Sequence, residues 1–139
     1  MALGSQRKPI TMRGSNSLER RASEPADRKD VSARHEAVTA SALGGKVQRG
    51  SGATERHKGD VKTPTLLVEN KTRLPDAKDG ARSITIKGAW LEKITLEAMA
   101  IGRDPALAFE IPGISDPLVE KRWVAVPESV MARFLESSD

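Results

Sequence analysis

Two acidic residues and a lysine in the middle of the chain have the types and spacing needed for metal-dependent chemistry. Asp60 precedes a run of strand-forming residues, 65–68, which leads directly into Glu69-Asn70-Lys71. Successive side chains of a strand point to opposite faces, so Glu69 and Lys71 share one face. If Asp60 lies on a neighbouring strand, the two acids can bind a divalent cation and the lysine can place a charge beside a water molecule. Because Glu-x-Lys is also common on solvated strand faces, the motif alone leaves a structural role open.

The composition narrows the kind of metal site that this chain can build. The chain has 139 residues, enough for one domain with a hydrophobic core. It contains no cysteine and two histidines, His35 and His57, which excludes disulfides, thiol catalysis and cysteine-ligated or histidine-rich metal sites. Any metal would be held by carboxylates, carbonyl oxygens and water. Those ligands indicate Mg²⁺, with Mn²⁺ as an alternative.

Positive charge is concentrated in the portion of the chain that holds the motif. Residues 1–90 contain 18 Lys and Arg against 10 Asp and Glu, a net charge of +8. Residues 91–139 contain 5 against 9, a net charge of −4. Acids embedded in basic sequence indicate an anionic substrate, whose charge the metal and the surrounding Lys and Arg would share. The alternative is a basic tail that only aids solubility.

The sequence also indicates where the protein works. No apolar run approaches the length needed to span a bilayer, and no secretory signal is visible. Acidic residues among the first thirty argue against a mitochondrial presequence: Glu19, Glu24, Asp27 and Asp30. We therefore expect a soluble protein in the cytoplasm of a bacterial or phage-infected cell.

The first thirty residues differ in composition from the rest. Residues 1–30 are rich in Arg, Lys and Ser and hold few large apolar side chains. Such a segment cannot bury enough apolar surface to offset the entropy lost on ordering, so we expect a disordered basic arm at 1–30 and one domain at 31–139. The arm could lie along a phosphate backbone, form part of a subunit interface or be an inert tail.

A helix is predicted at about 31–43, with Asp30 or Ser32 as its N-cap and the glycine pair 44–45 as its end. Glu36 lies near the start of this helix, where a glutamate could either complement the helix dipole or join an acidic site. The expected buried face is small and apolar: Ala33, Ala37, Ala40 and Leu43.

The remaining patterns predict an α/β fold, a small mixed β-sheet flanked by helices. The expected strands are 46–49, a strand from Asp60, 65–71, 105–111 and 123–126, with 83–86 either a short strand or an extended lead into a helix. The expected helices are 90–101, in which Trp90 would face the core or an interface, and a closing helix after Pro127. Residues 72–82 are expected to form a loop.

This order of elements resembles that of the PD-(D/E)xK nuclease superfamily, and within it the Holliday junction resolvases of archaeal and phage type. The resemblance covers about residues 30–127 and implies a restriction-endonuclease-like core. It is carried by Glu36, Ser51-Gly52, Gly59-Asp60, Glu69-Asn70-Lys71, the stretch from Ser83 through Trp90-Leu91-x-Lys93-Ile94, and the strand 105–111. Gly59 stands where the family pattern has proline.

The resemblance implies a role for each residue of the motif. Asp60 and Glu69 would coordinate Mg²⁺ together with the main-chain carbonyl of Asn70, and Glu36 would complete the acidic cluster, directly or through water. Lys71 would orient the attacking water and stabilise charge on the phosphate. The implied reaction is hydrolysis of a phosphodiester bond that leaves a 5′-phosphate and a 3′-hydroxyl.

The implied substrate is DNA, in particular a four-way junction, cut by a homodimer with one site in each subunit. Candidate DNA contacts are Arg49, Ser51, Arg56, His57, Lys58, Arg73 and Lys87. Recognition would depend on shape and phosphate positions more than on base edges. Two alternatives stay open: another DNA nuclease of the same superfamily, serving repair, restriction or replication, and a non-catalytic nucleic-acid-binding module whose acids are structural.

Overall fold

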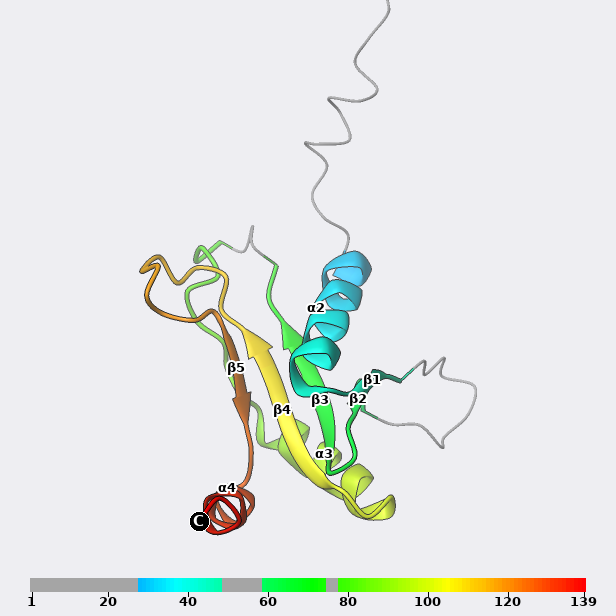
Figure 1. Cartoon of the computed structure of the whole chain (residues 1–139). Helices are drawn as coiled ribbons and strands as arrows, with labels where there is room; N and C mark the ends of the chain where they lie inside the picture. Colours follow the sequence, from blue (N-terminus) through cyan, green and yellow to red (C-terminus); the bar gives the residue numbers. More distant parts are fainter. Residues whose placement is uncertain (1–27, 49–58, 75–77) are drawn as a thin grey trace, which may run out of the picture.

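A five-stranded mixed sheet organises the part of the chain that the structure describes, which in this computed structural model is residues 28–48, 59–74 and 78–139 (Figure 1). The strands, in their order across the sheet, are β1 (Lys46–Val47), β2 (Val61–Lys62), β3 (Leu66–Thr72), β4 (Asp104–Glu110) and β5 (Arg122–Ala125). The helices are α2 (Arg28–Leu43), α3 (Gly88–Ala100) and α4 (Glu128–Glu136). This arrangement confirms the predicted α/β class, a small mixed sheet with helices.

The parallel pair of β3 and β4 forms the centre of the sheet. Its register places Val68 opposite Ala106, and every other neighbouring pair of strands is antiparallel. Parallel strands need a long crossover, and α3 lies in the chain between β3 and β4. Four successive residues of β4, from Pro105 to Ala108, are buried, as expected for a strand that is covered on both faces.

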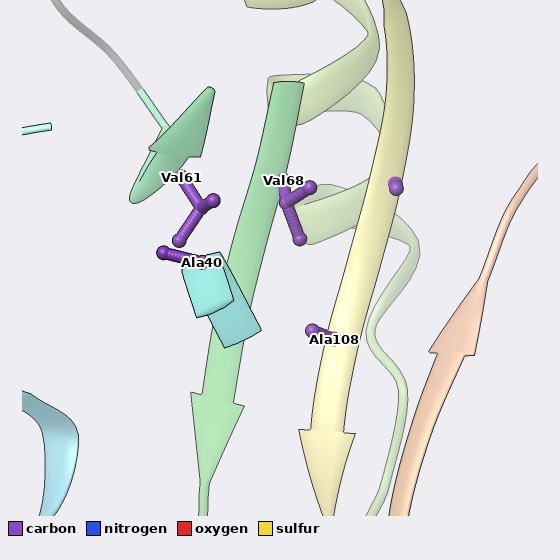
Figure 2. Close-up of a cluster of buried hydrophobic side chains, with 5 residues drawn as sticks. Ala40, Val61, Val68 and Ala108 are labelled. Carbon is purple, nitrogen blue, oxygen red and sulfur yellow. The ribbon is translucent and has the colours of Figure 1, made fainter. Parts of the chain in front are cut away.

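Helices pack against both faces of the sheet and create two small cores. On one face Ala40 of α2 lies beside Val61 and Val68, and the cluster continues to Ala106 and Ala108 (Figure 2). On the other face Leu67 packs with two residues of α3, Ile94 and Ala98. Adjacent residues of β3 therefore serve opposite cores, which assigns Val68 to the α2 face and Leu67 to the α3 face.

The end of α2 agrees with the prediction. The helix ends at Leu43, and Gly44 follows with a φ of +67°, a left-handed conformation that favours glycine. At Gly45 an added Cβ would lie 2.9 Å from the carbonyl oxygen of Lys62, so a side chain here would collide with β2. The glycine pair therefore both stops the helix and lets the chain turn closely against the sheet.

The start of α2 and its buried face differ from the prediction. The helix already includes Arg28, so residues 28–30 are helical rather than part of a disordered arm, and neither Asp30 nor Ser32 is the N-cap; residues 1–27 lie outside the described residues. The buried residues of α2 are His35, Thr39 and Ala40, whereas the predicted Ala33 and Ala37 are exposed. Ala40 is buried as predicted, but an apolar pattern could not reveal His35 and Thr39, because hydrogen bonds hold these two residues against the sheet.

The other elements lie within one or two residues of their predicted positions. For 83–86 the structure decides between the two predicted alternatives: it has no strand there, and Lys87 leads into α3 in an extended conformation, with φ −90° and ψ 134°. No helix within the described ranges is long and apolar enough to cross a membrane.

Candidate active site

Asp60 is placed by the short strand β2 and its partner β3. Its backbone N–H donates to Val68 O at 2.8 Å, and its carbonyl accepts from Gln48 N at 2.7 Å. Its side-chain Oδ2 accepts the backbone N–H of Asn70 at 2.7 Å. This last bond ties the carboxylate of Asp60 directly to the backbone between Glu69 and Lys71, so the predicted proximity of the three residues is present.

The residue before Asp60, where the superfamily that the sequence resembles has proline, has a conformation that favours glycine. Gly59 has a φ of +81°, whereas the ring of proline holds φ near −65°. An added Cβ at Gly59 would lie 2.7 Å from the side chain of Leu67. A proline is therefore incompatible with this turn, and glycine allows Asp60 to approach β3.

Glu69 and Lys71 point to the α3 face of the sheet and contact each other. The Nζ of Lys71 lies 2.9 Å from Oε1 of Glu69, and Glu69 is buried. The same Nζ lies 4.7 Å from the ring centroid of Trp90, and the Nζ of Lys87 lies 5.6 Å from that centroid. Trp90 therefore contributes a cation–π contact that holds Lys71 beside Glu69, a more specific role than the predicted core or interface position.

Glu36 on α2 lies close enough to the motif acids for their charges to act on it. Burial raises the pKa of Glu36 first, and the negative charges of Asp60 and Glu69 raise it further. Glu36 lies in the interior of a helix that begins at Arg28, beyond the first turn where the helix dipole acts. Glu36 is therefore too far from the helix start to complement the helix dipole. The charges that act on it are those of Asp60 and Glu69.

Asp60 experiences the same crowding of negative charge. Burial is the largest cause that raises the pKa of its carboxyl, followed by the charge of Glu69. The hydrogen bond from Asn70 and the charges of Lys71 and Lys93 act in the opposite direction without cancelling the rise. Three acids from α2, the β2 turn and β3 thus share one electrostatic environment, in which a bound cation would be stabilising.

A divalent cation at these acids stays a prediction. Within residues 28–48, 59–74 and 78–139, no three His, Asp or Glu side chains form a complete metal-binding group. A site of the predicted kind needs fewer side chains, because Asp60 and Glu69 would be joined by the Asn70 carbonyl and by water. The raised pKa of Asp60 and of Glu36 is the observation that favours such a cation.

Two residues of α3 extend the site beyond the predicted set. The Nζ of Lys93 lies 3.9 Å from Oε1 of Glu69 and 3.7 Å from Oε1 of Glu97. The sequence marked Lys93 through the Trp90-Leu91-x-Lys93-Ile94 stretch, but Glu97 was not predicted. Its only sequence signal is the four-residue spacing from Lys93, which places both side chains on one side of a helix.

Polar contacts behind the site attach β3 to α2. The side chain of Asn70 points to the α2 face and donates from Nδ2 to Thr39 Oγ1 at 3.2 Å, and Thr39 also accepts from Arg122 at 2.8 Å. His35 Nδ1 lies 2.5 Å from Thr72 Oγ1. Burial, reinforced by the charge of Arg122, lowers the pKa of His35 to about 4, so the imidazole is neutral near pH 7. These contacts orient α2 and with it Glu36.

Only some of the predicted DNA contacts lie among the residues that the structure describes. Arg49, Ser51, Arg56, His57 and Lys58 lie outside the described residues. The guanidinium of Arg73 donates to Asp79 at 2.6 Å and to the Ser83 carbonyl at 2.8 Å, which holds the loop together. Lys87 is exposed beside Trp90. A contact of Arg73 or Lys87 with DNA stays a prediction.

Comparison with known proteins identified no relative of this chain. Neither the family models, nor the curated proteins, nor the solved structures contain a match to this chain. The assignment of a function therefore depends on the residues and their arrangement.

A groove on the α2 face does not belong to the acidic cluster. It has a volume of about 530 Å³ and lies between α2 and the strands β4 and β5. Its lining includes His35, Arg122 and Trp123 but none of the acids Glu36, Asp60 and Glu69. The groove is therefore separate from the acids that the sequence predicts for metal binding.

Proposed function

We propose that this protein is a Mg²⁺-dependent, structure-selective DNA endonuclease that hydrolyses phosphodiester bonds and resolves four-way junctions. The observation that carries the proposal is the shared environment of Glu36, Asp60 and Glu69, with the Lys71 ammonium 2.9 Å from Glu69. Such crowding of acids costs stability, and groups with perturbed pKa values of this kind gather at functional sites. A lysine held beside them is the expected companion for hydrolysis of a phosphate ester.

Each residue has a task that follows from its position. Asp60, Glu69 and the Asn70 carbonyl would hold the metal, and Glu36 would bind to it directly or through water. When bound, Mg²⁺ would supply Lewis-acid stabilisation of negative charge on the phosphate. Lys71 orients the attacking water and faces the same charge, while the indole of Trp90 keeps its ammonium in place.

The proposed substrate follows from charge. The basic portion of the chain, residues 1–90, carries the net charge of +8 and also contains the acids and Lys71, which suits a phosphate backbone. A junction has approximate two-fold symmetry, so a homodimer with one site in each subunit would make its paired cuts. We place the reaction in the cytoplasm, where bacterial and phage DNA are found.

Cleavage of a labelled four-way DNA junction with Mg²⁺ tests the proposal. Linear duplex and a flap of the same sequence serve as substrate controls, and Asp60→Asn and Lys71→Ala as protein controls. We expect paired symmetric cuts in the junction alone, and a loss of at least about 100-fold in rate in both variants.

Each contrary result has a definite meaning. Equal rates on junction, flap and duplex would retain a nuclease and exclude junction selectivity. Full cleavage by Asp60→Asn or Lys71→Ala would make the site assignment wrong. Tight, salt-dependent binding without hydrolysis in either Mg²⁺ or Mn²⁺ would identify a binding module whose acids are structural.

A further inference from the structure

Glu97 lies at a position where a negatively charged side chain is unfavourable for the stability of the fold. Its side chain is only 7% exposed, and its Oε2 has no hydrogen-bond partner among the described residues. It lies in the last turn of α3, a position where the helix dipole disfavours negative charge. In its pair with Lys93 the lysine comes first, which is the less favourable order along a helix. Residues that break several local rules at once are expected at functional sites.

Lys93 is attracted by the charges of Glu69 and Glu97 but donates a hydrogen bond to neither of them. Its Nζ lies 3.7 Å from Glu97 and 3.9 Å from Glu69, and both distances exceed that of a hydrogen bond. The Lys93 side chain is 60% exposed, whereas that of Lys71 is 26% exposed and its ammonium lies over Trp90. Both lysines therefore lie near Oε1 of Glu69, and Lys93 is the more exposed of the two.

We propose that Lys93 is a substrate-binding residue that donates hydrogen bonds to a phosphate oxygen of DNA, and that Glu97 is the positioning residue that holds it beside Glu69. This inference rests on the proposed nuclease function. Glu97 lies 3.7 Å from the Lys93 ammonium, beyond hydrogen-bond distance, and the Lys93 side chain remains 60% exposed. An incoming phosphate would thus meet an accessible ammonium, held near Glu69 and Glu97 by charge, next to the acids that are proposed to bind the metal.

Metal-free DNA binding tests Lys93 separately from cleavage. Binding of duplex and junction DNA is measured in EDTA across a series of salt concentrations for wild type, Lys93→Met, Lys93→Arg and a control, Lys121→Met. Lys121 is exposed on the segment before β5 and is not part of the candidate site. We expect Lys93→Met to bind more weakly with a salt dependence lower by about one phosphate contact, Lys93→Arg to retain most binding, and the control to match wild type.

Kinetics with Mg²⁺ and unfolding measurements test Glu97. Lys93→Met should lower kcat/KM by roughly 10- to 100-fold. Glu97→Gln should lower it several-fold while leaving the midpoint of thermal unfolding unchanged or higher, since an unfavourable buried charge is removed. Glu92→Gln, an exposed change on the same helix, should alter neither. A merely structural Glu97 would instead lose stability and activity together, which would overturn its assignment.

The two proposals fail in different ways. If wild type cleaves DNA but Lys93→Met binds and cleaves like Lys121→Met, the role of Lys93 is wrong and the nuclease stands. If wild type binds DNA without cleaving it in any metal, the nuclease is wrong, and weaker binding by Lys93→Met would still support the phosphate contact. If wild type neither binds nor cleaves DNA, both are wrong.

Discussion

At the scale of single residues, the candidate site contains acidic side chains whose burial is unfavourable for the stability of the fold. Asp60 and Glu36 both have a raised pKa, which means that the folded protein disfavours their ionised forms. Glu69 and Glu97 are largely buried acids on the same side of the sheet. The lysines that approach them, Lys71 and Lys93, offset part of this cost. A cluster selected for stability alone would contain fewer buried carboxylates.

Replacing Asp60 by asparagine should therefore stabilise the metal-free fold. Asparagine can still accept the N–H of Asn70 but carries no charge. The ordinary pKa of Asp60 is 3.8 and the folded value is higher, so below pH 3.8 the group is protonated in both states and the change gains nothing. As the pH rises beyond the folded pKa, the gain becomes complete. We expect about 1 kcal/mol at pH 7.5, or about 4 °C in the thermal midpoint measured in EDTA.

The matched control is Asp116→Asn, because exposed Asp116 also accepts a backbone N–H, from Leu118 at 2.9 Å. It should show no comparable gain. An Asp60→Asn variant that is less stable than wild type at pH 7.5, or whose gain persists unchanged to pH 3, would contradict the electrostatic explanation. A stable variant also makes the cleavage control clean, since lost activity then does not result from unfolding.

At the scale of elements, the turn before β2 sets the distance between Asp60 and β3. Gly59 and Gly102 both have a left-handed φ, +81° and +66°, so both resist a side chain for the same conformational reason. They differ in space: an added Cβ at Gly59 would meet Leu67 at 2.7 Å, whereas at Gly102 it would meet nothing within 4 Å. A comparison of alanine substitutions at Gly59 and Gly102 therefore separates the cost of backbone strain from the cost of steric overlap.

Gly59→Ala should destabilise the protein by about 2 to 4 kcal/mol, and Gly102→Ala by about 1 kcal/mol. The difference arises because Leu67 belongs to the core against α3 and can move little. Urea unfolding of both variants measures it. Equal costs at the two positions would show that Leu67 yields to the added methyl group, and that the turn does not require the close approach described above.

At the scale of the whole molecule, the proposed reaction requires two sites. One chain of 15.0 kDa brings together one set of Glu36, Asp60, Glu69 and Lys71, and paired cuts need a second set. We expect a homodimer, with twice the mass of one chain by light scattering at the concentrations used for cleavage. Mixed dimers of wild type and Asp60→Asn should then cut only one strand of each junction.

A monomeric mass under conditions in which junctions receive paired cuts would contradict the dimer. Two cuts by mixed dimers that carry one altered subunit would also contradict the assignment of one site to each subunit. The ratio of the two subunits in the mixture supplies the control, because the yield of single cuts should follow the statistical share of mixed dimers.

The sequence by itself determined the strands and the local motif. Alternation in residues 65–71 is a property of neighbouring residues, so the shared face of Glu69 and Lys71 could be predicted and is present in β3. Helical spacing placed α3 and α4, and the glycine pair placed the end of α2. All of these signals act over a few residues, where backbone geometry fixes which side chains share a face.

The tertiary structure alone decided which distant residues meet. Glu36, Asp60, Glu69 and Lys93 come from four separate segments, and no local pattern measures the distance between them. The buried face of α2 was predicted only in part: Ala40 is buried as expected, whereas His35 and Thr39 are buried through hydrogen bonds to Thr72, Asn70 and Arg122, which apolar periodicity does not register. Glu97 was missed because the sequence shows only its four-residue spacing from Lys93, whereas the burial of its charge is set by packing.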